Sequence, residues 1–145
     1  MTLNLTKRGS PQPVDLEYKL SGNWTEWTES NNIRTVSIPV GEKVYIRGDN
    51  STFSNSNNFY KFTSDGYLKA SGNIMSLLEK DALSNTITQD YVFKSLFEEM
   101  AITTAPKLPA TTLSRNCYQQ MFDGCTSLTT APELPATTLT SSCYK

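Results

Sequence analysis

The chain contains no histidine among its 145 residues, so it lacks the side chain most often used as a general base and a common zinc ligand. It also lacks a Gly-x-Ser-x-Gly string, a phosphate-binding glycine loop and a Cys-x-x-Cys pair. None of the 14 acidic residues sits in a setting typical of the paired carboxylates of a glycosidase. The sequence therefore predicts no enzymatic activity, no cofactor and no metal site.

Long apolar runs and a strong charge of either sign are also missing. The N-terminal string MTLNLTKRGSP has no hydrophobic stretch typical of a secretory signal peptide, and no segment approaches the length of a transmembrane helix. The net charge is −1, and the basic residues form no stripe that would bind nucleic acid. We therefore expect a soluble protein without nucleic-acid or membrane partners.

The chain does contain an internal repeat. Residues 103–119 read TTAPKLPATTLSRNCYQ and residues 129–145 read TTAPELPATTLTSSCYK, so that 12 of 17 positions match at an offset of 26. Every mismatch exchanges one polar residue for another. The full unit spans residues 103–128, a length within the range of leucine-rich repeats. The second copy is incomplete.

A repeat protein buries the same face of each unit against the next unit, so the matching apolar positions are expected to face inward. The three cysteines of the chain fall on such positions, which favours buried free thiols over disulfides or metal ligands. The expected repeat core is Leu108, Leu113, Cys117, Met121, Phe122, Cys125, Leu128, Leu134, Leu139 and Cys143.

Each unit is expected to combine an extended segment with a short helix. Residues 108–113 are flanked or interrupted by prolines, which oppose helix. Ser114 is expected to cap a short helix that ends at Gly124. Residues 92–97 align with residues 117–122 and indicate a degenerate earlier copy, whereas a plain amphipathic helix at residues 89–100 is compatible with the same pattern.

The first part of the chain has the alternation and turn signals of short antiparallel strands. A short helix or turn is expected at residues 74–78. The predicted organisation is an Ig-like β-sandwich at residues 1–73, a helical connector and cap at residues 74–102, and repeats at residues 103–145. The fold class is thus mostly β with short helices, beginning a leucine-rich-repeat solenoid. The expected strands are residues 16–20, 33–40, 43–47, 58–63 and 67–71.

The strings LPATTL, CYQQMFDGCTSL and APELPATTL resemble the BspA-like leucine-rich repeats of Bacteroides and of phages that infect gut bacteria. The resemblance covers about residues 90–145. It implies a curved solenoid used for adhesion or recognition, without catalysis. Residues 16–50 are more loosely similar to small sandwich modules of gut-bacterial and phage-tail proteins.

Two groups of side chains are candidates for ligand binding. Trp24 and Trp27 are suited to stacking on a sugar, although burial of at least one in the sandwich core explains them equally. The repeated threonines offer a row of hydroxyls, although threonine also simply suits strands. The string Arg47-Gly48-Asp49 matches an integrin-binding motif and is expected to be only a turn. The candidate binding residues are Trp24, Trp27, Thr111, Thr112, Tyr118, Thr137 and Thr138.

The expected function is a structural or recognition protein, in the first instance a phage virion component that binds a protein or glycan on a host surface. The expected location is the virion or a cell surface, and the expected partners include other virion proteins and further copies of the chain. A bacterial adhesin fragment and a carbohydrate-binding module that uses the sandwich are the alternatives. The apolar edge left by the incomplete repeat favours assembly with a partner.

Overall fold

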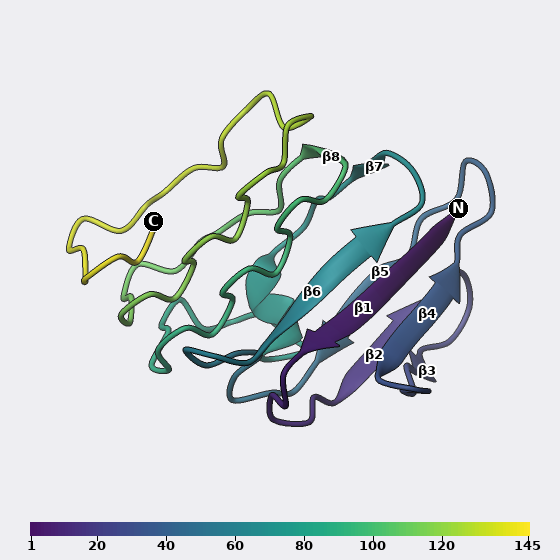
Figure 1. Ribbon diagram of the computed structural model, residues 1–145, viewed down its shortest axis with the longest axis horizontal. Coiled ribbons are helices and arrows are strands. Elements are labelled where there is room, and N and C mark those ends of the chain that lie inside the picture. Colours follow the sequence, from purple (N-terminus) through teal and green to yellow (C-terminus); the bar gives the residue numbers. More distant parts are fainter.

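Short strands, tight turns and irregular segments make up almost all of the computed structural model, which describes residues 1–145 (Figure 1). The only helix is one turn of 3₁₀ helix, η1, at Ile74–Leu77, where a short helix or turn was expected. The strands are β1 (Thr2–Arg8), β2 (Leu16–Lys19), β3 (Thr25–Glu26), β4 (Ile33–Ser37), β5 (Tyr45–Gly48), β6 (Phe59–Ser64), β7 (Leu68–Lys69) and β8 (Ile102–Thr104).

Two small antiparallel sheets form the N-terminal half. One has the strand order β4-β1-β6 and the other β3-β2-β5. Leu3 and Leu5 of β1 and Leu16 of β2 are buried, and the indole of Trp27 lies among them and stacks on Phe62 of β6. The core of this half therefore consists of the alternating apolar residues of both sheets.

The central strand of the first sheet, β1, was not among the strands predicted from the sequence. Strand β1 pairs with β4 along one edge and with β6 along the other. Its sequence, TLNLTKR, alternates as a half-buried strand does, with Leu3 and Leu5 inward. The strand predicted at residues 67–71 is shorter than expected, at Leu68–Lys69, and its partner is also different. Strand β7 joins neither sheet of the sandwich, because it pairs in parallel with β8, across the predicted domain boundary at residue 73.

The helices expected at residues 89–100 and from Ser114 to Gly124 are absent. Residues 90–99, 115–124 and 141–144 form consecutive tight turns, and we call them the first, second and third turn segments. Within them φ is positive at every fourth residue, at Tyr91, Ser95 and Glu99, at Asn116, Gln120 and Gly124, and at Ser142. A right-handed helix cannot continue through such residues, since it needs negative φ throughout.

Main-chain hydrogen bonds join each turn segment to the next. Alternate N–H groups of the first segment, beginning with Tyr91 and Phe93, donate to the carbonyls of Arg115, Cys117 and following alternate residues at 2.6–3.1 Å. The N–H groups between them close turns inside the segment, as from Lys94 to Tyr91. The first segment therefore satisfies half of its donors locally and half through its neighbour, which a helix would not do.

Two rows of aromatic rings run from the sandwich into the turn segments, and one of them reaches the third segment. The first row is Trp27, Phe62, Phe97 and Phe122, with neighbouring ring centroids 5.4–6.4 Å apart. The second row is Phe53, Phe93, Tyr118 and Tyr144, with centroids 5.7–6.1 Å apart. The stacking of Phe93 on Tyr118 and of Phe97 on Phe122 follows the alignment of residues 92–97 with residues 117–122.

The expected repeat core is buried in the complete unit and partly exposed in the last one. Leu108, Leu113, Cys117, Met121, Cys125 and Cys143 are buried, and Phe122 and Leu128 are half-buried. Leu134 and Leu139 were expected to face inward, but they are 47% and 62% exposed. Their equivalents in the complete unit, Leu108 and Leu113, are 3% and 7% exposed.

Leu96 and Leu83 provide a matched test of this packing. Leu96 is fully buried in the first turn segment, and Leu83 is 83% exposed in the loop before it. We expect Leu96→Ala to lower the free energy of unfolding by about 2–5 kcal/mol, because it opens a cavity. Leu83→Ala should change it by less than about 0.5 kcal/mol. Urea titration followed by circular dichroism measures both, and equal losses would contradict the structure.

Tyr118 and Tyr60 provide a second matched test, of the cost of a buried hydroxyl without a hydrogen bond. The buried hydroxyl of Tyr118 has no hydrogen-bond partner, whereas the hydroxyl of Tyr60 donates to the carbonyl of Gln12 at 2.9 Å. Tyr118→Phe should leave stability unchanged or raise it by about 1 kcal/mol, since it removes an unsatisfied polar group. Tyr60→Phe should lower it by about 1 kcal/mol. The thermal unfolding temperature should therefore fall in Tyr60→Phe and should not fall in Tyr118→Phe.

Candidate functional site

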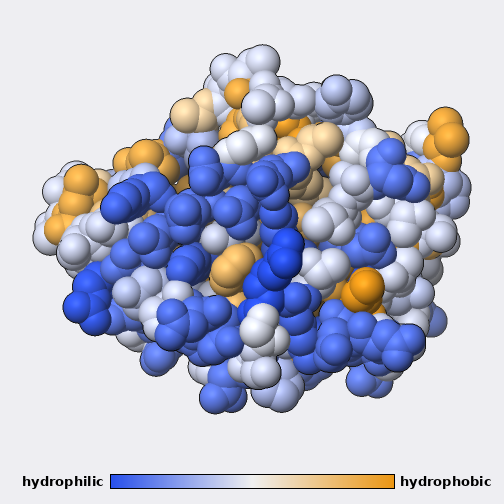
Figure 2. Space-filling model, in the orientation of Figure 1, coloured by the Kyte–Doolittle hydropathy of each residue, from blue (hydrophilic) through white to orange (hydrophobic).

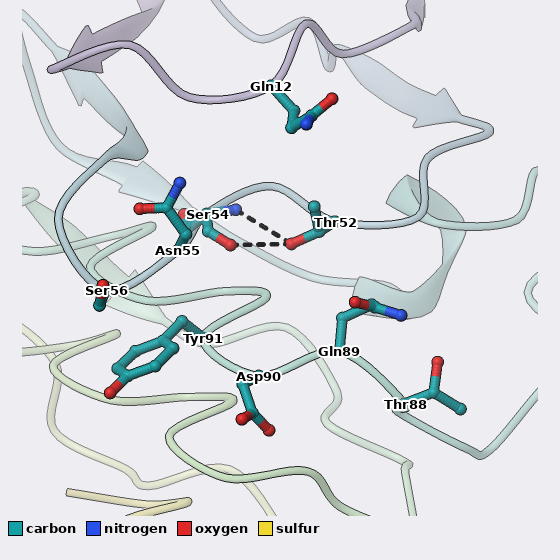
Figure 3. Close-up of a pocket in the computed structure, with 9 residues that line it drawn as sticks. All are labelled: Gln12, Thr52, Ser54, Asn55, Ser56, Thr88, Gln89, Asp90 and Tyr91. Carbon is teal, nitrogen blue, oxygen red and sulfur yellow. Dashed lines mark hydrogen bonds between the residues drawn. The ribbon is translucent and has the colours of Figure 1, made fainter.

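A polar hollow lies where the sandwich meets the first turn segment (Figure 3). Its volume is about 510 Å³, and eight of its nine lining residues are polar. We call it the junction cleft. Gln12 lies on one side of it, residues 88–91 lie on the opposite side, and the loop of residues 52–56 lies between them. The lining residues are Gln12, Thr52, Ser54, Asn55, Ser56, Thr88, Gln89, Asp90 and Tyr91.

Local interactions hold each wall of the cleft in place. Gln12 stands between two prolines, which restrict φ, and its carbonyl accepts the hydrogen bond from Tyr60. The Thr52 hydroxyl accepts from the N–H of Ser54 at 3.3 Å and donates to its carbonyl at 2.8 Å, which fixes the turn of the middle loop. The Nζ of Lys94 donates to the carbonyl of Ser56 at 2.6 Å and ties that loop to the first turn segment.

Several polar side chains around the cleft have no hydrogen-bond partner within the protein. The free groups are the amides of Gln12 and Gln89 and the hydroxyls of Ser56, Thr88 and Tyr91. Amides and hydroxyls both donate and accept hydrogen bonds. Because the backbone that carries them is fixed, these groups can bind a ligand without a large reorganisation of the chain.

Asp90 anchors the cleft to the second turn segment. Its Oδ1 accepts from the Ser114 hydroxyl and from the N–H of Arg115 at 3.1 Å, and its Oδ2 accepts from the Arg115 guanidinium at 3.2 Å. The Ser114 hydrogen bond, followed by those from Arg115, holds the pKa of the Asp90 carboxyl below its usual value. The one carboxylate of the cleft is thus ionised and already paired with a cation.

The chemistry of the cleft is therefore that of neutral hydrogen bonding with one aromatic ring, Tyr91, at its edge. No three carboxylate or thiol side chains in the structure come together as a set of metal ligands. None of the residues that carry this chemistry was singled out from the sequence. They come from three separate stretches of the chain with ordinary polar composition, so only the fold brings them together.

The two tryptophans predicted to form a platform lie in different environments. Trp27 is only 2% exposed, and its Nε1 donates to the carbonyl of Thr35 at 3.1 Å, so it belongs to the core and cannot stack on a ligand. Trp24 is half-buried, with the Arg47 guanidinium 4.0 Å and the Lys19 ammonium 4.8 Å from its ring centroid. A pair of tryptophans open to a sugar is thus not present.

The predicted threonine row lies on the surface. Thr111, Thr112, Thr137 and Thr138 are all exposed, and Thr112 pairs with Thr86 in an isolated parallel bridge. Tyr118, which was predicted to bind ligand, is instead 3% exposed in the second aromatic row. Burial of its ring between Phe93 and Tyr144 excludes it from a binding surface.

Two other sequence features have structural roles. Arg47 and Gly48 end strand β5, where Arg47 pairs with Glu17 at 2.9 Å and Asp49 lies 3.6 Å from the Lys80 ammonium. Two of the three residues of the tripeptide thus take part in ion pairs of the fold. The three cysteines are free and buried, and burial raises the pKa of the Cys117 thiol to about 12.

Comparisons with protein-family models, curated proteins and solved structures find no match to this chain. No helix of the structure has the length and apolar character that crossing a bilayer requires. The case for a function therefore depends on the geometry of the junction cleft and of the turn segments.

The anchoring of Asp90 predicts a pH dependence. Because its folded-state pKa is lowered, Asp90 stabilises the fold above its unfolded-state pKa, and this stabilisation is lost as the pH falls through its folded-state pKa. Ser114→Ala removes the hydrogen bond that contributes most to the lowered pKa of Asp90. The Asp90 pKa should therefore rise towards its usual value, as measured by carboxyl NMR titration. An unchanged Asp90 pKa in this variant would contradict the assigned hydrogen bond.

Proposed function

We propose that the protein is a non-catalytic recognition protein that binds a neutral glycan in the junction cleft. The observation that carries the proposal is the group of unpartnered amides and hydroxyls around one fixed hollow, with an aromatic ring at its edge. A sugar presents hydroxyls that donate and accept, together with an apolar ring face. Ligand sites are also often found where two structural units meet.

Charge supports a neutral ligand over a charged one. The Asp90 carboxylate is neutralised by Arg115, and the nearby Lys94 ammonium is occupied by the Ser56 carbonyl and lies 5.7 Å from the Tyr91 ring centroid. A charged ligand would find no unpaired opposite charge in the cleft lining. A ligand whose hydrogen-bonding groups are hydroxyls and amides would fit the groups that are free.

In this proposal the turn segments are the beginning of a leucine-rich-repeat solenoid of the BspA-like type, and they serve as a rigid support. Two observations support that assignment: the match of 12 of 17 positions between residues 103–119 and residues 129–145, and the two aromatic rows. The resemblance to repeats of gut bacteria and their phages supports a host-surface glycan as the ligand and a virion as the location. A bacterial adhesin is the alternative with the same ligand chemistry.

Recognition of a protein by the threonine row is the second candidate. The observation that favours it is the exposure of Thr111, Thr112, Thr137 and Thr138 at equivalent positions of two consecutive units. The two candidates use different residues, so substitutions can separate them.

A glycan array followed by calorimetry on the best ligand tests the proposal. Thr88→Ala and Gln89→Ala each remove one free group of the cleft and should weaken binding about two- to tenfold, the value of one hydrogen bond. Thr138→Ala, an exposed threonine outside the cleft, is the matched control and should have no effect. Loss of binding only in Thr138→Ala would favour the threonine row, and an array without any ligand would refute glycan recognition.

A further inference from the structure

A loop before the first turn segment has no counterpart in the unit that follows it. Two isolated parallel bridges pair Asn73 with Lys107 and Thr86 with Thr112. Thirteen residue steps separate Asn73 from Thr86, whereas five separate Lys107 from Thr112, so the first path contains eight additional residues. This longer path makes the η1 turn and then the loop of residues 78–85, which we call the additional loop.

Hydrogen bonds hold the additional loop at both of its ends. At the sandwich end, the N–H of Asn50 donates to the carbonyl of Leu78 at 2.9 Å. At the other end, the N–H of Thr111 donates to the carbonyl of Asn85 at 2.9 Å. The loop is therefore fixed between the sandwich and the next unit, so a ligand that binds beside it meets a preformed wall.

A second hollow lies beside the additional loop, and we call it the side hollow. Its volume is about 200 Å³, and Thr88 and Gln89 line both this hollow and the junction cleft. Figure 3 shows these two residues on the side of the junction cleft away from Ser56. The two hollows therefore adjoin. The additional loop contributes to the side hollow the residues Leu78, Glu79 and Ser84.

The side hollow is less polar than the junction cleft. Four of its eleven lining residues are hydrophobic, against one of nine in the junction cleft. Met75, Ile87 and Val92 are buried, so the apolar surface lies at the base of the hollow. The hydroxyls of Ser51 and Thr86 also line it and make no hydrogen bond within the protein. Such a hollow suits a group that combines a methyl with hydrogen-bonding atoms.

The charge of the side hollow comes from Glu79. Its Oε2 accepts from the N–H of Ser84 at 3.2 Å, and its carboxylate forms no ion pair. The adjacent ammonium of Lys80 is paired instead with Glu17 and Asp49, at 3.2 and 3.6 Å. A carboxylate accepts hydrogen bonds and donates none. Glu79 therefore suits an amide N–H and opposes the carboxylate of an acidic sugar.

The surface favours a small polar ligand over a broad hydrophobic partner. Figure 2 shows one face of the molecule, on which hydrophobic residues form small groups among hydrophilic ones. In the additional loop the exposed large hydrophobic residue is Leu83 alone. A protein-docking surface would more typically present a continuous apolar patch.

We infer that the side hollow is a second subsite of the junction cleft and binds a sugar that carries an acetamido group. The methyl of that group packs on the apolar base, and its N–H donates to the Glu79 carboxylate. The neighbouring sugar occupies the junction cleft, and Thr88 and Gln89 contact both sugars. This specificity rests on the proposed function, since one glycan spans the two hollows.

A glycan array of paired compounds tests this. Each disaccharide of two neutral hexoses is accompanied by a counterpart of the same linkage in which an acetamido group replaces one hydroxyl. The chain should bind an acetamido member at least about fourfold more tightly than its counterpart, the value of burying one methyl group. Calorimetry on that pair measures the two affinities.

Ser51 and Ser56 provide matched variants, because both are exposed serines between β5 and β6 and each lines only one of the hollows. Ser51→Trp fills the side hollow and should abolish the acetamido preference, while the hexose counterpart still binds. Ser56→Trp fills the junction cleft and should weaken the binding of both compounds. Glu79→Ala removes the acceptor of the amide N–H and should lower the preference about two- to tenfold. Circular dichroism checks that each variant is folded.

The possible outcomes distinguish the second subsite from glycan recognition itself. An array on which no compound binds would refute both. Binding without an acetamido preference would overturn the second subsite alone, as would a preference that persists in Ser51→Trp and Glu79→Ala. In those cases glycan recognition by the junction cleft would stand.

Discussion

Two rows of stacked aromatic rings tie the turn segments to the sandwich. One row begins on the sandwich at Trp27 and Phe62 and continues through Phe97 and Phe122. The other begins at Phe53 and continues through one ring of each turn segment, Phe93, Tyr118 and Tyr144. Six residues other than glycine hold positive φ in these segments, at a cost of about 1–2 kcal/mol each. The isolated turn would not adopt that backbone, so the burial and stacking of the rings must impose it.

The dependence on ring stacking explains which parts of the fold could be predicted. The repeat was visible as sequence identity, and the alignment of residues 92–97 with residues 117–122 placed the right rings together. The backbone that joins those rings was not visible. Apolar residues at spacings of four and five suggested a helix, because a chain of turns with a four-residue period gives nearly the same pattern as a helix with 3.6 residues per turn.

Other differences have separate physical causes. Strand β1 was missed although Leu3 and Leu5 alternate in the usual way, and that signal could have identified it. In the sequence, a tryptophan that belongs to the core looks the same as one that stacks on a sugar. Only the packing of the sheets shows that Trp27 is buried. The junction cleft was beyond prediction, since Gln12 and Gln89 come to line one hollow only through the packing of the sandwich on the first turn segment. No local pattern marks such residues.

The spacing of the rings also indicates where the chain can change in length. Phe93 and Phe97 are four residues apart, as are Tyr118 and Phe122, so an insertion inside a turn segment would displace one ring from its row. The connections between segments carry no such restriction. Two residue steps separate Met100 from Ile102, and three separate the aligned Cys125 and Leu128. The steps that follow Met100 and Cys125 therefore accommodate a difference in length that the turn segments themselves would not.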